Sequence, residues 1–169
     1  MKKYIGTKII EARPGTHAEA EALKGDFPVE VAERMFRNSG TVNRDGWIVK
    51  YPDGYISWSP KEAFEEAYRE CDNMPFGLAI EALKKGCKVA RKGWNGKGMW
   101  LYLTPGSKVF YTDLKEDTKK GLLNNRCVDD NGYATINPHI DMSAADGSVV
   151  IGWLASQTDM LADDWYIVE

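Results

Sequence analysis

The chain has 169 residues, of which 43% are hydrophobic and 28% charged, a composition typical of a soluble globular protein. Its formal net charge is −3 and neither half is strongly basic, which argues against the wrapping of long DNA or RNA. Apolar runs fall short of the roughly 20 residues of a membrane helix, and we expect no signal peptide. The odd count of three cysteines without a CxxC pair favours a reducing compartment over a disulfide frame or a zinc site.

The first part of the chain alternates short apolar segments with turn residues. Thr16 is placed to cap a helix that Gly25 ends. A Pro-Asp-Gly turn between two strand-like runs gives the strongest hairpin signal of the sequence. Ser59 and Glu62 fit a capping box at the start of a further helix. The predicted elements are strand 4–12, helices 17–24 and 29–37, strands 47–51 and 55–58, and helix 60–69.

The second part begins after a polar segment, 71–75, that we interpret as a linker. Residues 107–137 are rich in Asp, Asn, Lys and Gly and predict a long, irregular excursion with one strand at 109–111. Ser156, with Asp159 three residues later, predicts a short capped helix. The other predicted elements are helix 76–85, strands 88–91, 99–103, 148–153 and 165–168, and a turn followed by a strand over 137–142.

Short turns between strands predict an α+β protein with mainly antiparallel sheets. We expect a small module over residues 1–70 and a second domain over 74–169. A module of about 70 residues buries a limited core, so the first should pack on the second or on another subunit.

Catalytic patterns are sparse in this sequence. His139 lies two residues before Asp141, on the same side of a strand, and the two could act as acid and base or form a structural hydrogen bond. The HExxH, GxSxG and Walker motifs are absent. The pairs 129–130 and 163–164 are acidic, and we interpret both as solvated turns or edges rather than metal sites.

Binding signals are stronger. Residues 84–97 contain six basic residues and no acidic one, and Gly93, Gly96 and Gly98 bracket a turn that carries Trp94 and Asn95. Aromatic faces and donors on such a loop suit a nucleotide; in the alternative interpretation the tryptophans are core residues. The helix start at Ser156 could hold a phosphate, or Ser156 and Asp159 could serve only as caps. Together these signals favour holding a ligand over converting it.

Two segments, FGLAIEALKKGCKVARKGWNGKGMWLYL and NPHIDMSAADGSVVIGWLASQTDMLADDWYIVE, resemble a phage and prophage family associated with type-two Thoeris anti-defence proteins. The resemblance covers residues 74–169. It implies a non-enzymatic, homo-oligomeric sponge, a dimer or tetramer with pockets between subunits, in the cytoplasm of the infected bacterium. Such a protein binds glycocyclic ADP-ribose made by a TIR enzyme, and some members also hold cyclic di- or oligonucleotides. The segments YIGTKIIEARP and WIVKYPDGYISWSPKEAFEEAYR are similar to an accessory module that precedes other phage-encoded domains.

The resemblance and the binding signals lead to one set of expected ligand contacts, with no catalytic residue, metal ligand or cofactor among them. Stacking or wall contacts are expected from Phe76, Trp94, Met99 and Trp100. Phosphate contacts are expected from Arg91 and Lys97. Ribose and base contacts are expected from Asn95, Asp141, Ser156, Gln157 and Asp159. A core or capping role is the alternative for each. The rival functions are a nucleotide hydrolase using His139 and Asp141, and a phage structural or interaction module without a ligand.

Overall fold

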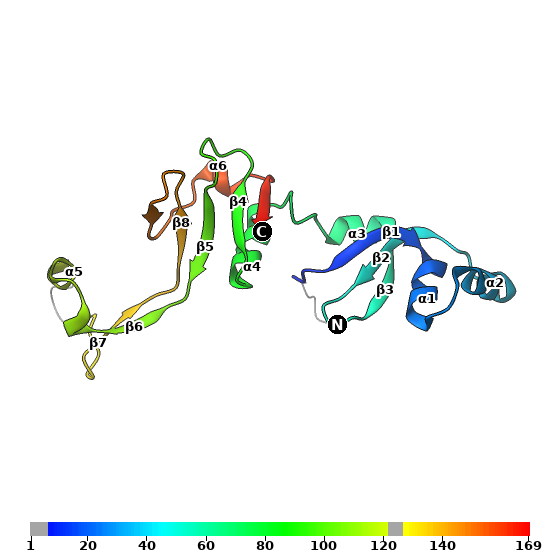
Figure 1. The fold of residues 1–169 in the computed structure, drawn as a ribbon, viewed down its shortest axis with the longest axis horizontal. Coiled ribbons are helices and arrows are strands. Elements are labelled where there is room, and N and C mark those ends of the chain that lie inside the picture. Colours follow the sequence, from blue (N-terminus) through cyan, green and yellow to red (C-terminus); the bar gives the residue numbers. More distant parts are fainter. Residues whose placement is uncertain (1–6, 122–126) are drawn as a thin grey trace. The chain divides into compact units, whose positions relative to one another are not determined.

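A computed structural model describes residues 7–121 and 127–169 (Figure 1). The chain separates into two compact units, Met1–Arg69 (unit 1) and Glu70–Glu169 (unit 2). Each combines short helices with antiparallel strands, so the predicted α+β class is confirmed. Within the described ranges, no helix is long and apolar enough to cross a membrane.

Unit 1 is built on a three-stranded antiparallel sheet of order β1-β2-β3. Its elements are β1 (Glu11–Thr16), α1 (His17–Gly25), α2 (Val29–Ser39), β2 (Asp45–Lys50), β3 (Ile56–Pro60) and α3 (Lys61–Ala67). The predicted hairpin is the β2–β3 pair. Thr16 caps α1 as predicted, because its hydroxyl accepts a hydrogen bond from the Glu19 amide at 3.2 Å.

Aromatic stacking covers both faces of this sheet. At the start of α1, His17 stacks on Trp58 of β3, with ring centroids 4.7 Å apart. On the other face, Phe64 of α3 stacks on Trp47 of β2 at 4.5 Å. The alternation of side chains along β2 and β3 thus gives each helix its own face of the sheet.

Two predictions for unit 1 are wrong. The first strand begins at Glu11 rather than at residue 4; residues 7–10 are not strand, and residues 4–6 lie outside the described ranges. The strand continues through Pro14, which an edge strand tolerates. Ser59 does not cap α3, because it pairs with Trp47 inside β3; Pro60 occupies the cap position, without a side-chain hydrogen bond.

Unit 2 contains a five-stranded antiparallel sheet of order β10-β4-β5-β8-β9. Its helices are α4 (Phe76–Lys84), α5 (Glu116–Gly121) and α6 (Gln157–Met160), with a 3-10 turn at Tyr111–Asp113. The strands of the large sheet are β4 (Lys88–Arg91), β5 (Trp100–Thr104), β8 (His139–Ser143), β9 (Val149–Val150) and β10 (Trp165–Val168). The helix and strands predicted at 76–85, 88–91, 99–103 and 165–168 match α4, β4, β5 and β10.

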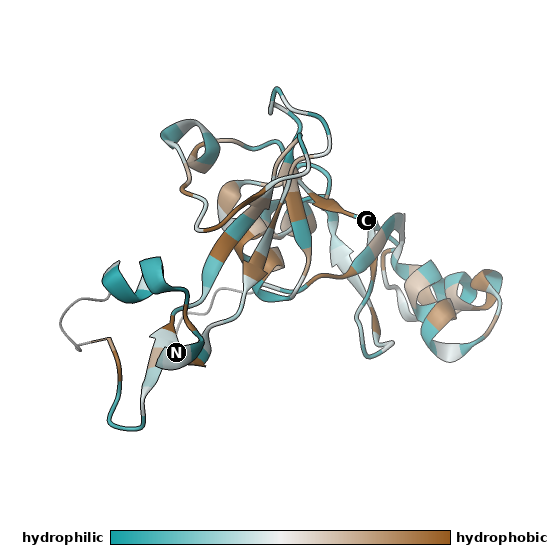
Figure 2. Cartoon of the chain, turned by 60° about the vertical axis from the view of Figure 1, so that its left-hand side comes forward, coloured by the Kyte–Doolittle hydropathy of each residue, from teal (hydrophilic) through white to brown (hydrophobic). Residues whose placement is uncertain are grey.

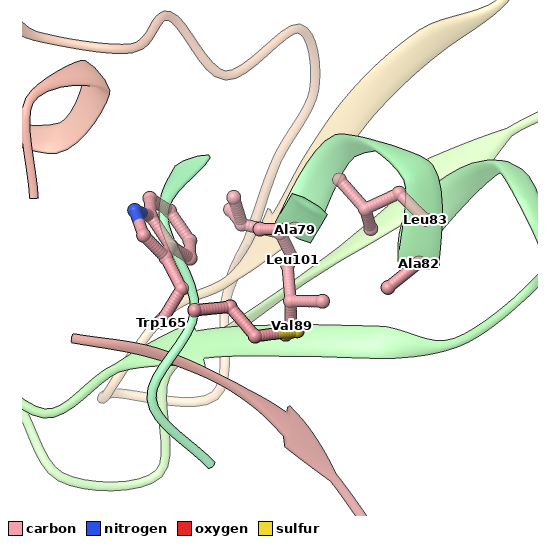
Figure 3. Close-up of a cluster of buried hydrophobic side chains, with 7 residues drawn as sticks. Ala79, Ala82, Leu83, Val89, Leu101 and Trp165 are labelled. Carbon is pink, nitrogen blue, oxygen red and sulfur yellow. The ribbon is translucent and has the colours of Figure 1, made fainter. Parts of the chain in front are cut away.

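The core of unit 2 lies between α4 and one face of the large sheet (Figure 3). Ala79 and Leu83 of α4 meet Val89 of β4, Leu101 of β5 and Trp165 of β10. All five are buried, and Trp165 is 0% exposed. Its indole N–H donates to the backbone oxygen of Asp159 at 3.0 Å, so this large ring is buried with its polar atom satisfied.

The segment interpreted as a linker is partly built into unit 2. Met74 exchanges two backbone hydrogen bonds with Trp165, at 2.7 and 3.1 Å, and the Ile167 amide donates to the Cys71 oxygen at 2.9 Å. These bonds lay residues 71–74 alongside β10 and carry the chain directly into α4.

The excursion is more regular than predicted. Strands β6 (Ser107–Phe110) and β7 (Tyr133–Ile136) form a separate two-stranded sheet, and α5 follows β6. Helix α5, next to the grey segment in Figure 2, is almost wholly hydrophilic. The strand predicted at 148–153 shrinks to β9, because the chain turns at Gly152, where φ is +74°.

Candidate functional site

Four aromatic rings meet beside the first turn of α6, and we call Phe76, Trp94, Trp153 and Trp165 the aromatic cluster. Trp94 lies edge-on to Trp165 at 5.4 Å and to Trp153 at 6.2 Å. Phe76, the first residue of α4, lies 5.3 Å from Trp165 and 6.4 Å from Trp153. Trp165 is buried, whereas the other three rings are half-buried. The cluster therefore has a sealed base and an accessible rim.

Asp159 fixes the orientation of Trp94. Its Oδ1 accepts hydrogen bonds from the Trp94 indole N–H at 3.0 Å and from Arg91 Nη1 at 2.8 Å. Its Oδ2 accepts from the amide and the hydroxyl of Ser156, at 3.1 and 2.7 Å. The Ser156 hydroxyl in turn accepts from the Asp159 amide, which confirms the predicted capping box.

Burial of the Asp159 carboxylate, which is 9% exposed as a residue, opposes its ionisation. Hydrogen bonds from Ser156, Trp94 and Arg91 outweigh that effect and lower the pKa of Asp159 to about 2. The carboxylate is thus ionised at neutral pH, and its negative charge is paired with Arg91.

Arg91 joins α6 to the segment before β10. Besides contacting Asp159, its guanidinium donates to both oxygens of Asp164, from Nε at 2.7 Å and from Nη2 at 3.4 Å. Only 11% of the Arg91 side chain is exposed. This hydrogen bonding lowers the pKa of Asp164 and raises that of Arg91. Such a two-pronged pair fixes geometry as well as charge.

A second buried carboxylate, Asp141 of β8, holds the segment that leads to Trp153. It accepts hydrogen bonds from the Thr104 hydroxyl and, at 2.9 Å, from the Gly152 amide. The Trp153 amide donates to the Ile140 oxygen at 2.7 Å. Burial raises the pKa of Asp141, but these hydrogen bonds and nearby His139 lower it overall. The two anchors tie Trp153 to the sheet.

Residues 74–168 match the family described as Thoeris anti-defense 2-like domain. The chain belongs to this family. It is similar to Thoeris anti-defense 2 of Bacillus phage SP01, with 38% identity over 95 residues, which is 56% of this chain and 94% of the relative. The matched range contains the whole aromatic cluster, and it excludes unit 1.

The Thoeris anti-defense 2-like domain brings together five of the eleven residues expected from the sequence: Phe76, Arg91, Trp94, Ser156 and Asp159. Three more are exposed near them in sequence: Asn95 and Lys97 in the loop after Trp94, and Gln157 at the first position of α6. Met99 is half-buried under the same loop, where its sulfur would lie 2.6 Å from a Cβ at Gly96.

The remaining two expected residues lie elsewhere on the sheet of this domain. Trp100 alternates with the core residue Leu101 and so faces away from α4, with Lys88 Nζ 4.5 Å from its ring centroid. Asp141 contacts Thr104 and Gly152, as described above. His139 lies within 3.5 Å of Asp141, on the same side of β8 as predicted.

Sequence reasoning left out two tryptophans of the cluster and one carboxylate. Trp153 lies three residues before Ser156, the helix start for which a phosphate contact was considered, but the ring itself was not among the expected contacts. Asp164 was interpreted as solvated, which is wrong, because it binds Arg91 across 73 residues of sequence. Among residues 7–121 and 127–169, no group of three or more His, Cys, Asp or Glu side chains could hold a metal ion.

Proposed function

We propose that this protein binds glycocyclic ADP-ribose immune signals and sequesters them unchanged, which blocks TIR-based Thoeris defence in the infected bacterial cytoplasm. Membership of the Thoeris anti-defense 2-like family supports the biological setting. The observation that carries the chemistry is the aromatic cluster with its accessible rim, because flat, half-buried rings stack on nucleobases at about 1–3 kcal/mol per base.

In this proposal the side chains of the site divide into two groups, those that contact the ligand and those that support them. Phe76, Trp94 and Trp153 offer ring surface to the ligand, while the exposed Asn95, Lys97 and Gln157 reach its ribose and phosphates. The buried charges serve as supports. Arg91 and Asp159 satisfy each other and hold Trp94, so their contribution to binding is to fix the rings in advance.

The proposal also describes a binder rather than a catalyst. A general base needs a lone pair that can reach water or substrate. Both oxygens of Asp159 and both oxygens of Asp141 already accept hydrogen bonds from the protein, and Asp141 is 4% exposed. In the rival nucleotide hydrolase His139 would be the base, but its Nδ1 lies 2.8 Å from the Asn137 oxygen and its Nε2 3.5 Å from Asp141 Oδ1, so both ring nitrogens already face oxygen atoms of the protein.

We further propose a homo-oligomer, a dimer or tetramer, with ligand sites between subunits. Large apolar side chains are exposed next to the short strand β9 and around α6, and surfaces of this kind mark interfaces. The exposed fractions are 56% for Val149, 75% for Ile151, 88% for Leu154 and 79% for Leu161. Light scattering of the purified chain tests this part, and a monomer at micromolar concentration would contradict it.

Calorimetry with glycocyclic ADP-ribose isomers tests the binding proposal directly. We expect a saturable heat, and the ligand should be recovered with unchanged mass after the protein is heat-denatured. Trp94→Ala and Trp153→Ala should each weaken binding by about 10-fold or more, through loss of stacking. Tyr55→Ala, which removes an aromatic ring 59% exposed in unit 1, is the matched control and should bind normally.

Each rival predicts a different result in the same experiment. Recovery of a hydrolysed ligand would support the nucleotide hydrolase. Binding of cyclic dinucleotides or oligonucleotides, without binding of ADP-ribose derivatives, would support sequestration of a different signal. Absence of heat with every one of these compounds would favour a structural or interaction module.

A further inference from the structure

We infer that Asp164 is the positioning residue for the ligand-binding loop 92–99, and that it acts through Gly93 and Arg91. The inference rests on the proposed function, because it assigns a role in presenting Trp94 to the signal. Asp164 lies immediately before β10, outside that loop, and its side chain is 30% exposed.

Asp164 binds the start of the loop through both its carboxylate and its backbone. Its Oδ2 accepts a hydrogen bond from the Gly93 amide at 2.7 Å, and its backbone oxygen accepts from the Lys92 amide at 3.2 Å. The same carboxylate holds Arg91, the last residue of β4. Three consecutive residues at the strand-to-loop transition are therefore fastened to this one residue.

Glycine at position 93 leaves room for the Asp164 carboxylate, which any larger residue would have to displace. A Cβ built on Gly93 would lie 2.7 Å from Asp164 Oδ2 and 3.2 Å from Arg91 Nη2. Both distances are shorter than ordinary van der Waals contacts, so a side chain at position 93 would occupy the space that the Asp164 carboxylate needs. Gly93 allows the charged group to lie directly against the loop backbone.

Trp94 is held from two sides as a result. Its backbone follows the fastened Gly93, and its indole N–H is fixed by Asp159, which shares Arg91 with Asp164. A ring held in this way need not be ordered when the ligand arrives, and less of the binding free energy is lost to that ordering. Loosening Asp164 should therefore weaken binding even though Asp164 touches no ligand.

A double-mutant cycle between positions 93 and 164 tests the inference, with glycocyclic ADP-ribose as the probe. Gly93→Ala should weaken binding by about 10-fold because its methyl group displaces the carboxylate, and Asp164→Ala should do so by about 10-fold because the acceptor is gone. The double variant should also lose only about 10-fold, since the clash disappears with the carboxylate. Asp163→Ala, which removes the neighbouring carboxylate, is the matched control and should bind like the unmodified protein.

Independent losses that multiply to about 100-fold in the double variant would overturn the inference, as would normal binding by Asp164→Ala. If Asp164→Ala does not fold, Asp164→Ser replaces it in the cycle, because its shorter side chain also makes room for the methyl group introduced by Gly93→Ala.

Amide hydrogen exchange separates positioning from general stability and needs no ligand. In the free Asp164→Ala protein, the Gly93 and Trp94 amides should exchange faster while those of Val89 and Ile167 keep their protection. Uniform acceleration across all four would refute a positioning role. If the unmodified protein binds none of the isomers, the proposed function fails, and this exchange pattern still decides whether Asp164 organises the loop.

Discussion

Asp159→Asn removes the charge at the centre of the site while keeping the shape of the side chain. The asparagine keeps one acceptor oxygen and turns an NH₂ group toward either Ser156 or the Arg91 and Trp94 donors, so at least two existing hydrogen bonds are lost. Breaking a buried ion pair costs about 3–5 kcal/mol. Arg91 keeps Asp164 as a partner, and we therefore expect a loss at the lower end, about 3 kcal/mol.

Part of this loss should depend on pH in a defined direction. The pKa of Asp159 is lowered from 3.8 to about 2 on folding, which corresponds to about 2 kcal/mol of stability. Because the folded pKa lies below the unfolded one, this contribution is complete above pH 3.8 and disappears as the pH falls toward 2. The stability difference between the two proteins should therefore be largest near neutral pH and shrink by roughly 2 kcal/mol in acid.

Hydrogen exchange of the β4 and β10 amides in the full chain measures this difference within unit 2, apart from any opening of unit 1. The Ser156→Ala protein, with the carboxylate intact, is the control and should retain the part of the acid-dependent term that Trp94 and Arg91 contribute. A difference between Asp159→Asn and the unmodified protein that stays constant from about pH 6 to about pH 3 would refute the assignment of the charge to the folded state.

Three further predictions concern the supports of the site. Ser156→Ala should destabilise unit 2 by about 1 kcal/mol through loss of the α6 cap, measured by urea unfolding. Trp165→Ala should cost about 3–5 kcal/mol in the same assay because the side chain is fully buried, and a loss below about 1 kcal/mol would contradict its central place in the core. Asp141→Ala removes both acceptor oxygens, so it should free the Gly152 amide and raise its hydrogen-exchange rate, with little change at β10; unaltered protection of Gly152 would count against the anchor.

Local sequence signals predicted the elements whose causes are local. Ser156 and Asp159 stand three residues apart and form the capping box that their spacing indicates. Ser59 carries the same kind of signal, yet it belongs to β3, where pairing with Trp47 outweighs a helix cap. The difference between the two serines lies in a sheet partner that a short window of sequence does not contain.

The candidate site divides in the same way. The sequence pattern predicted which aromatic and polar residues of the loop belong to the site, but it did not predict the hydrogen bonds and ion pairs between them. Arg91 binds carboxylates 68 and 73 residues away, so no spacing rule could pair them. The same limit applies to β7, which pairs with β6 across the excursion, with Ser107 opposite Ile136. Expected ligand contacts such as Arg91 and Asp159 consequently emerged as internal partners.

The order of the strands has a consequence for the newly made protein. Strand β10 lies next to β4 in the sheet although the other four strands of that sheet all precede it in the chain, and it carries Trp165 into the core. A nascent chain that has left the ribosome only as far as β9 contains Arg91 but not its partner Asp164, and Phe76 but not its neighbour Trp165. Such a chain has the loop and two of the four rings of the aromatic cluster, and the contacts of Arg91 with Asp164 and of Phe76 with Trp165 form only after β10 has been made.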